Sequence, residues 1–111
     1  MKSFGNIKTA GPTSTSVLAT LKGKYEGKTI LLRADIDALP MQEESDEEFA
    51  SIVKNVAHTC GHDTHTAMLL ATAKVLSGMQ DQLHGTVKFI FQHGEEKNWR
   101  GKRNYCDRFI K

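Results

Sequence analysis

A short run of metal-binding side chains, followed at once by a helical pattern, constrains this chain more than any other feature. Residues 58–65 read His-Thr-Cys-Gly-His-Asp-Thr-His, and thiolate and imidazole are groups that zinc-like ions prefer. Gly61 permits a sharp backbone turn, so that Cys60 and His62 can face one ion. Two ligands do not complete a metal site, so other segments must supply oxygen ligands.

The segment after this run is predicted to be a helix with its N-terminus beside the metal-binding residues. Asp63 or Thr64 can cap it, and its positive end would favour a thiolate at Cys60. Two roles stay open for His65 in the first turn, a surface histidine or a contact that supports the site. Apolar and small residues at helical spacing are expected to form the buried face, namely Met68, Ala71, Thr72, Val75, Leu76 and Met79.

Three strands are predicted, and together with the helix they indicate an α/β fold. They cover residues 17–21, 29–36 and 86–92. A hairpin-like turn with two glycines is expected at residues 22–28, between the first two strands. The second strand is nearly continuous in apolar residues, which is typical of a strand buried on both faces.

Acidic residues follow two of these strands, where ligands of α/β sheets gather. Arg33, Asp35 and Asp37 lie at the end of the second strand, and an Arg33–Asp35 ion pair is the simplest role for that pair. Glu95 and Glu96 follow the third strand. Adjacent residues of a strand point apart, so both glutamates can serve one site only where the backbone leaves strand geometry. The residues at 41–51 are also acidic, and we expect them to form a solvated loop.

Length, charge and cysteine content restrict the remaining possibilities. A chain of 111 residues is one domain or part of one. Residues 97–111 hold six basic residues and one acidic residue, a charge of +5, which leaves −3 for residues 1–96 of the net +2. No feature of residues 1–96 indicates a nucleic-acid surface, and no apolar run is long enough to span a membrane. Two cysteines make a disulfide framework unexpected, which favours the cytoplasm.

Three motifs closely resemble those of the aminoacylase and hippurate hydrolase group of two-metal amidohydrolases, which have a zinc-exopeptidase-like fold. They are Leu-Arg-Ala-Asp-Ile-Asp-Ala-Leu-Pro at 32–40, His-Thr-Cys-Gly-His-Asp-Thr-His-Thr-Ala-Met at 58–68 and Gly-Thr-Val-Lys-Phe-Ile-Phe-Gln-His-Gly-Glu-Glu at 85–96. The resemblance covers residues 11–96. It implies a central mixed sheet with flanking helices.

The resemblance also implies roles for single residues. Glu95 corresponds to the catalytic base and Asp37 to the carboxylate that supports the metal pair, while Cys60, His62 and Glu96 correspond to metal ligands. The complete site would hold two divalent ions, such as zinc or manganese, and would hydrolyse N-acyl amino acids or related small amides. Whether the parent enzyme is a homo-oligomer stays open.

The family's further histidine ligands lie in downstream segments that have no counterpart here. Residues 1–96 are therefore expected to be a truncated catalytic domain that is inactive alone, and residues 97–111 a basic tail outside the family pattern. A reading-frame shift after Glu96 would explain that tail. The alternatives are a non-catalytic metal-binding remnant, a single structural zinc and a basic-tailed interaction module. A structural zinc is disfavoured because the chain lacks a Cys-x-x-Cys motif.

Overall fold

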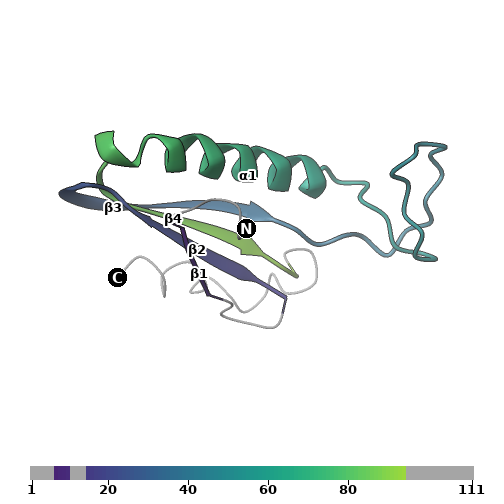
Figure 1. Cartoon of the computed structure of the whole chain (residues 1–111). Helices are drawn as coiled ribbons and strands as arrows, with labels where there is room; N and C mark the ends of the chain where they lie inside the picture. The colour runs from purple at the N-terminus through teal and green to yellow at the C-terminus, as the bar shows by residue number, and fades with distance from the viewer. Residues whose placement is uncertain (1–6, 11–14, 95–111) are drawn as a thin grey trace.

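A single helix covers one face of a four-stranded mixed sheet in the computed structural model, which describes residues 7–10 and 15–94 (Figure 1). The strands are β1 (Lys8–Ala10), β2 (Val17–Lys22), β3 (Tyr25–Asp35) and β4 (His84–Gln92), and the helix is α1 (His62–Gly78). A short 3-10 turn, η1 (Gln80–Gln82), links α1 to β4. No helix among the described residues is long and apolar enough to cross a membrane.

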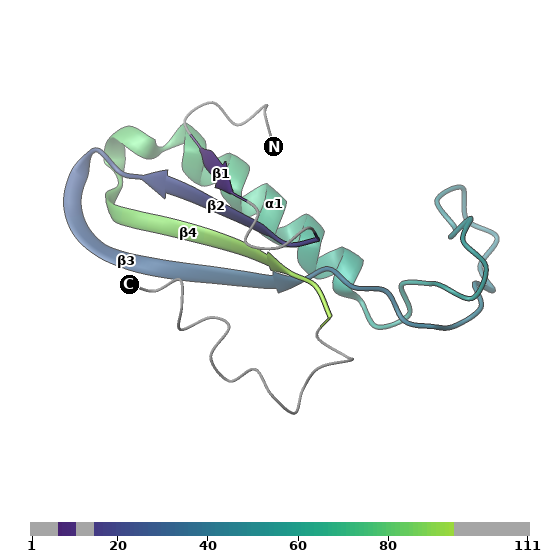
Figure 2. The same cartoon turned by 90° about the horizontal axis from the view of Figure 1, so that it is seen from below.

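The sheet order is β1-β2-β4-β3, so β4 lies between β2 and β3, which are consecutive in the sequence (Figure 2). It pairs antiparallel with β2 and parallel with β3. The mixed α/β sheet expected from the sequence is confirmed. The predicted hairpin is wrong, because β2 and β3 are not neighbours.

The glycines of the predicted hairpin serve a different purpose from the one expected. Neither Gly23 nor Gly27 has a positive φ angle. A Cβ at Gly23 would collide with the Leu83 carbonyl oxygen, and one at Gly27 would lie 2.8 Å from the Gly85 nitrogen. These glycines therefore let the start of β3 approach the backbone of β4 closely, whereas Gly85 takes the left-handed conformation, with φ 89°.

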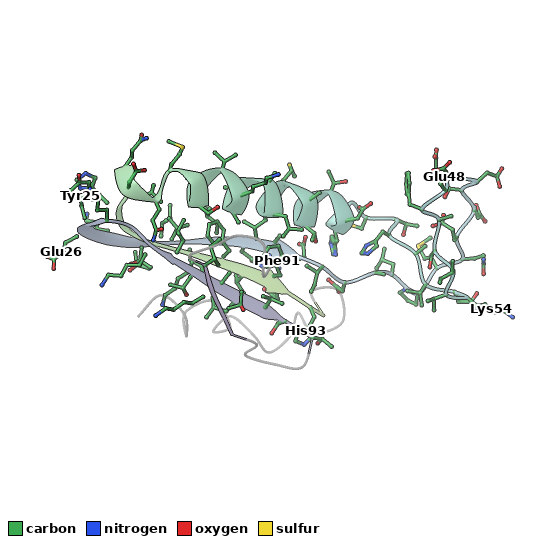
Figure 3. The ribbon with its side chains drawn as sticks, in the orientation of Figure 1. Tyr25, Glu26, Glu48, Lys54, Phe91 and His93 are labelled. Atoms are coloured by element: carbon green, nitrogen blue, oxygen red, sulfur yellow. The ribbon has the colours of Figure 1, made fainter. Side chains whose placement is uncertain are left out.

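The core lies between the sheet and α1, where Phe91 is seen beneath the helix (Figure 3). Phe89 and Leu21 are fully buried there. Alternate residues of β2 and β4 point to this face, as the pleat of a strand requires. The buried cluster consists of Ala19, Leu21, Ala34, Leu69, Ala73, Val87, Phe89 and Phe91.

The helix buries a different stripe from the one predicted. Its buried residues are His62, Leu69 and Ala73, with Leu70 and Leu76 partly buried against the core. The spacing from 62 to 69, 73 and 76 fits a helical face, and it includes a histidine that a purely apolar pattern misses. Of the predicted stripe, Leu76 packs inward. The others face solvent in the part of the chain that the structure describes: Met68, Ala71, Thr72, Val75 and Met79.

The predicted start of α1 is also corrected. Gly61 occupies the N-cap position with φ 86°, and no side chain caps the helix. Asp63 and Thr64 lie inside the first turn instead. An acidic residue there still complements the positive end of the helix.

Strand β3 is not buried on both faces, contrary to the sequence expectation. It forms one edge of the described sheet, and its first half, residues 25–30, is exposed. Only Ala34 and Asp35 at its end are buried. A continuous apolar run does not by itself distinguish a covered strand from a half-covered one.

A long loop, residues 36–61, leaves the end of β3, extends beyond the sheet and returns to α1. Glu48 and Lys54 lie at its distal part (Figure 3). Leu39 and Ala57 exchange two backbone hydrogen bonds, of 3.0 and 3.1 Å, that close its base. The acidic segment inside this loop is largely exposed, as expected.

Candidate metal and catalytic site

The candidate site is built where the end of β3 meets the first turn of α1. The parallel register pairs Asp35 of β3 with Gln92 of β4, so both strands end at the same edge of the sheet. His62 is the first residue of α1 and is only 4% exposed. Parallel pairing and the crossover helix therefore bring together the acidic residues at 35–37 and the histidine motif, as the sequence predicted.

His62 is anchored by Asp37 through one ring nitrogen. Its Nδ1 lies 2.9 Å from the Asp37 carbonyl oxygen and 3.1 Å from Asp37 Oδ1. Both partners are acceptors, so Nδ1 carries the proton and donates. In the neutral ring the lone pair is then on Nε2, which lies 3.8 Å from Asp35 Oδ2. A carboxylate that fixes the tautomer in this way is typical of a metal-binding histidine.

Asp35 contacts both the helix and its own strand. Its Oδ1 lies 2.7 Å from His65 Nδ1, and its Oδ2 lies 3.7 Å from an Nη atom of Arg33. The predicted Arg33–Asp35 ion pair is confirmed, but the shorter contact is the one with His65. Of the two roles left open for His65, the structure shows features of both, because the side chain contacts Asp35 and is also 49% exposed. Arg33 also donates from Nε to Gln92 Oε1 at 2.7 Å.

The hydroxyl of Thr66 adds a further link between α1 and β3. It lies 3.2 Å from the Asp35 carbonyl oxygen and 2.8 Å from the His62 carbonyl oxygen. Sequence reasoning missed Thr66 and did not identify Asp35 as the partner of His65. The signal that could have found them is spacing, because positions 62, 65 and 66 share one face of a helix.

The buried charges of the site shift two pKa values. Burial lowers the pKa of His62, but the hydrogen bond to the Asp37 carbonyl and the carboxylates of Asp35 and Asp37 outweigh burial and raise it. Burial raises the pKa of Asp35, but the His65 hydrogen bond, His62 and Arg33 together lower it below its ordinary value. A metal ion at Nε2 of His62 would compete with a proton for that nitrogen, so metal binding there would favour higher pH.

The turn between the two predicted protein ligands has the expected form. Gly61, with φ 86°, lies between Cys60 and His62. Cys60 is exposed. An anchored imidazole and a nearby thiol fit the ligand chemistry of zinc-like ions. Among the described residues, however, no three His, Cys, Asp or Glu side chains group closely enough to hold an ion, so these residues supply only part of a site.

Glu95 and Glu96, the predicted base and third ligand, lie outside the described residues, as does the tail at 97–111. The backbone just before them is described. His93 lies beyond the end of β4 (Figure 3), and Gly94 has φ 66°, so the chain leaves strand geometry there, which is the condition for Glu95 and Glu96 to share a site. The roles of Asp37, Cys60, His62, Glu95 and Glu96 stay predictions.

Comparison with known proteins gives consistent matches. Residues 31–111 match peptidase family M20/M25/M40. The chain is 52% identical over 96 residues to an N-acyl-L-amino acid amidohydrolase of Geobacillus stearothermophilus, covering 86% of this chain and 26% of that protein. It is 51% identical over 82 residues to an N-acetylcysteine deacetylase of Bacillus subtilis, covering 74% of this chain and 22% of that protein.

A solved structure extends the likeness to three dimensions. The Bacillus subtilis YxeP protein, described as a dinuclear metal-binding peptidase of the M20 family, aligns with a TM-score of 0.73 and 48% identity. The alignment covers 78% of this chain and 24% of that one. The chain thus spans about a quarter of the length of the proteins it matches.

Proposed function

Because the chain belongs to peptidase family M20/M25/M40, we propose that it is part of a metal-dependent amidohydrolase acting on N-acyl amino acids or related small amides. The substrate class is supported by the names of two similar proteins, an N-acyl-L-amino acid amidohydrolase and an N-acetylcysteine deacetylase. The dinuclear metal-binding neighbour supports the use of divalent ions.

The observation that carries the proposal is the His62–Asp37 pair at the sheet edge. Nδ1 of His62 donates to the carbonyl oxygen and to Oδ1 of Asp37, so the ring cannot easily rotate. Nε2 is then the nitrogen that can bind a metal ion. We assign Cys60, His62 and Glu96 as metal ligands. The complete site would hold two divalent ions, which would be zinc, manganese or a similar metal.

The residues of this chain would divide the chemistry among them. Bound divalent ions supply Lewis acidity and activate a water molecule. We assign Glu95 as the base that takes the proton from this water and passes it to the amine that leaves. Asp37 keeps His62 in the correct tautomer throughout. The cytoplasm is our proposed compartment, and a homo-oligomeric parent enzyme stays open.

A chimera tests this proposal in a complete enzyme. Residues 11–96 of this chain would replace the corresponding segment of the 52%-identical Geobacillus stearothermophilus amidohydrolase. We expect the chimera to hydrolyse N-acetyl amino acids and Glu95→Gln to abolish turnover while metal content is unchanged. A folded, metal-loaded chimera without hydrolysis would contradict the proposal.

The second candidate function is a metal-binding remnant without catalysis. It is favoured by the incomplete donor group among the described residues. The two candidates differ in the chimera, because a remnant that has lost a catalytic side chain would not support turnover in an otherwise complete enzyme.

A further inference from the structure

The carboxylate of Asp35 lies between two imidazoles and faces each with a different oxygen. Oδ1 lies 2.7 Å from His65 Nδ1, and Oδ2 lies 3.8 Å from His62 Nε2. The side chain is largely buried, so few orientations are open to it. The His65 contact is the shortest of its interactions and is assisted by charge, which makes it the strongest of them.

A competing partner shares the second oxygen. Arg33 lies 3.7 Å from Asp35 Oδ2, on the strand side of the carboxylate. Its guanidinium carries five N–H donors and suits a bidentate contact with a carboxylate. Without the hydrogen bond at Oδ1, the carboxylate could rotate toward Arg33 and away from His62. The groups that face Asp35 are thus His62 and His65 from α1 and Arg33 from β3.

We propose that His65 is a positioning residue, whose Nδ1–H holds the Asp35 carboxylate so that Oδ2 stays on the Nε2 side of His62. This inference rests on the proposed function, because it takes His62 Nε2 as a metal-binding nitrogen. His65 then acts on the metal site through Asp35. The negative charge of Asp35 is thereby kept beside the position at which a cation would bind.

A purely structural role for His65 fits the geometry less well. Its side chain is 49% exposed, so its loss removes little apolar burial. The helix is held to the sheet independently, by Leu69 and Ala73 in the core and by the Thr66 hydroxyl on the Asp35 carbonyl. Substitution of His65 should therefore change metal binding more than folding.

The test is a Co²⁺ titration of the full 111-residue chain at fixed pH, with three variants of His65 and one control. His65→Ala removes the donor, whereas His65→Asn keeps an N–H close to the position of Nδ1, and His65→Gln places one close to Nε2. The control is His84→Ala, since His84 is exposed and stacks on Tyr25 at the far end of the sheet, with ring centroids 4.7 Å apart.

We expect His65→Ala to weaken Co²⁺ binding by up to about tenfold, the lower end of the range for loss of a residue that contacts a metal ligand, because His65 acts on His62 only through Asp35. His65→Asn should restore most of this affinity. His65→Gln should bind as weakly as His65→Ala, and the control His84→Ala should bind as tightly as the wild type. In the metal-free chain, the Asp35 carboxyl carbon and the Arg33 guanidinium should change their NMR shifts in His65→Ala and return in His65→Asn.

Each contrary result has a defined meaning. Equal affinity and unchanged Asp35 and Arg33 signals in His65→Ala would overturn the positioning role, and these signals are read without metal. Rescue by Gln but not by Asn would also overturn it, because Nε2 and not Nδ1 would then be the active atom. A folded wild-type chain that binds no Co²⁺ would instead overturn the proposed metal site, and the positioning role with it.

Discussion

His62 and Asp37 are joined through one nitrogen and two oxygens, with Nδ1 2.9 Å from the Asp37 carbonyl and 3.1 Å from its carboxylate. The two contacts differ in what a substitution can remove. A change of side chain deletes the carboxylate contact but leaves the backbone carbonyl in place. His62 should therefore keep its tautomer in part when Asp37 is replaced.

Replacement of Asp37 is predicted to weaken metal binding without abolishing it. We expect Asp37→Ala to lower Co²⁺ affinity by about 10- to 100-fold, and Asp37→Asn to lower it less, because the amide oxygen can still accept from Nδ1. Titration monitored by visible absorbance measures both. Asp81→Asn, in the short turn after α1, is the matched control. If Asp37→Ala and the wild type bind Co²⁺ with the same affinity, Asp37 does not support the metal site.

Cys60 is predicted to give the site its spectroscopic signature. A thiolate bound to Co²⁺ produces a charge-transfer band in the near ultraviolet, and Cys60→Ser should remove it. Helix α1 begins two residues later, at His62. Cys106 is the other cysteine of the chain, so Cys106→Ser serves as the control and should leave the band intact. A band that persists in Cys60→Ser would assign it to another thiol.

The proximity of the candidate site residues was more predictable from the sequence than the packing around them. The motif at 58–65 and the acidic pair at 35 and 37 carry their chemistry in residue type and spacing, which the fold only has to bring together. The buried face of α1 was not predictable in the same way. Val75 and Leu76 are both apolar, and only the position of the sheet determines that Leu76 packs inward while Val75 is 60% exposed.

Strand order depends on contacts that are distant in the sequence. Lys22 and Tyr25 are close in the chain and look like the two sides of a hairpin, yet β4 inserts between their strands. The glycines at 23 and 27 were predicted to supply positive φ angles to a hairpin turn, and this is wrong, because neither has a positive φ. Glycine is required at both positions because the backbone of residues 83–85, about sixty residues later in the sequence, packs against them.

Acid is predicted to loosen the long loop through Glu43. The backbone N–H of Ser51, followed by that of Ser45, donates to its carboxylate, and these bonds lower the pKa of Glu43 from 4.5 to about 2. A depressed pKa stabilises the folded loop above pH 4.5, and the stabilisation is lost as the pH falls from 4.5 toward 2.

NMR measures this transition directly. The amide signals of Ser45 and Ser51 should titrate together with the Glu43 carboxyl carbon, with a midpoint near pH 2. In Glu43→Gln both amides should lose that acid transition. A midpoint close to 4.5 in the wild type would show that the two hydrogen bonds do not form in solution.

Two glycines are predicted to respond in opposite ways to the same substitution. Gly85 has φ 89°, and a Cβ there would collide with the Lys28 carbonyl oxygen, so Gly85→Ala should destabilise the fold by at least about 1–3 kcal/mol. Gly78, the last residue of α1, has no atom within 4 Å of an added Cβ. Gly78→Ala should raise stability by up to about 1 kcal/mol.

Urea unfolding followed by circular dichroism compares the two variants. If Gly85→Ala and the wild type unfold at the same urea concentration, the β3 and β4 backbones do not approach each other closely at this point.

The chain is expected to be only marginally stable, because α1 exposes Met68 and Val75 and β3 forms an edge of the described sheet. The Gly78→Ala background therefore provides a useful reserve of stability for the other variants.

The last prediction is that the 111-residue chain alone hydrolyses N-acyl amino acids negligibly. Hydrolysis with two ions requires that water and carbonyl be polarised together, and therefore that the ligands be held at a fixed separation. Asp37 holds the ring of His62 in place, but the described residues group no three potential ligands, and the chain spans about a quarter of the length of its relatives. A site without its supporting residues is too loose for efficient chemistry.

An assay of the metal-supplemented chain on N-acetyl and N-benzoyl amino acids should give no turnover above that of Glu95→Gln, whereas the chimera should be active. Turnover by the chain that Glu95→Gln removes would show that these 111 residues already form a complete site.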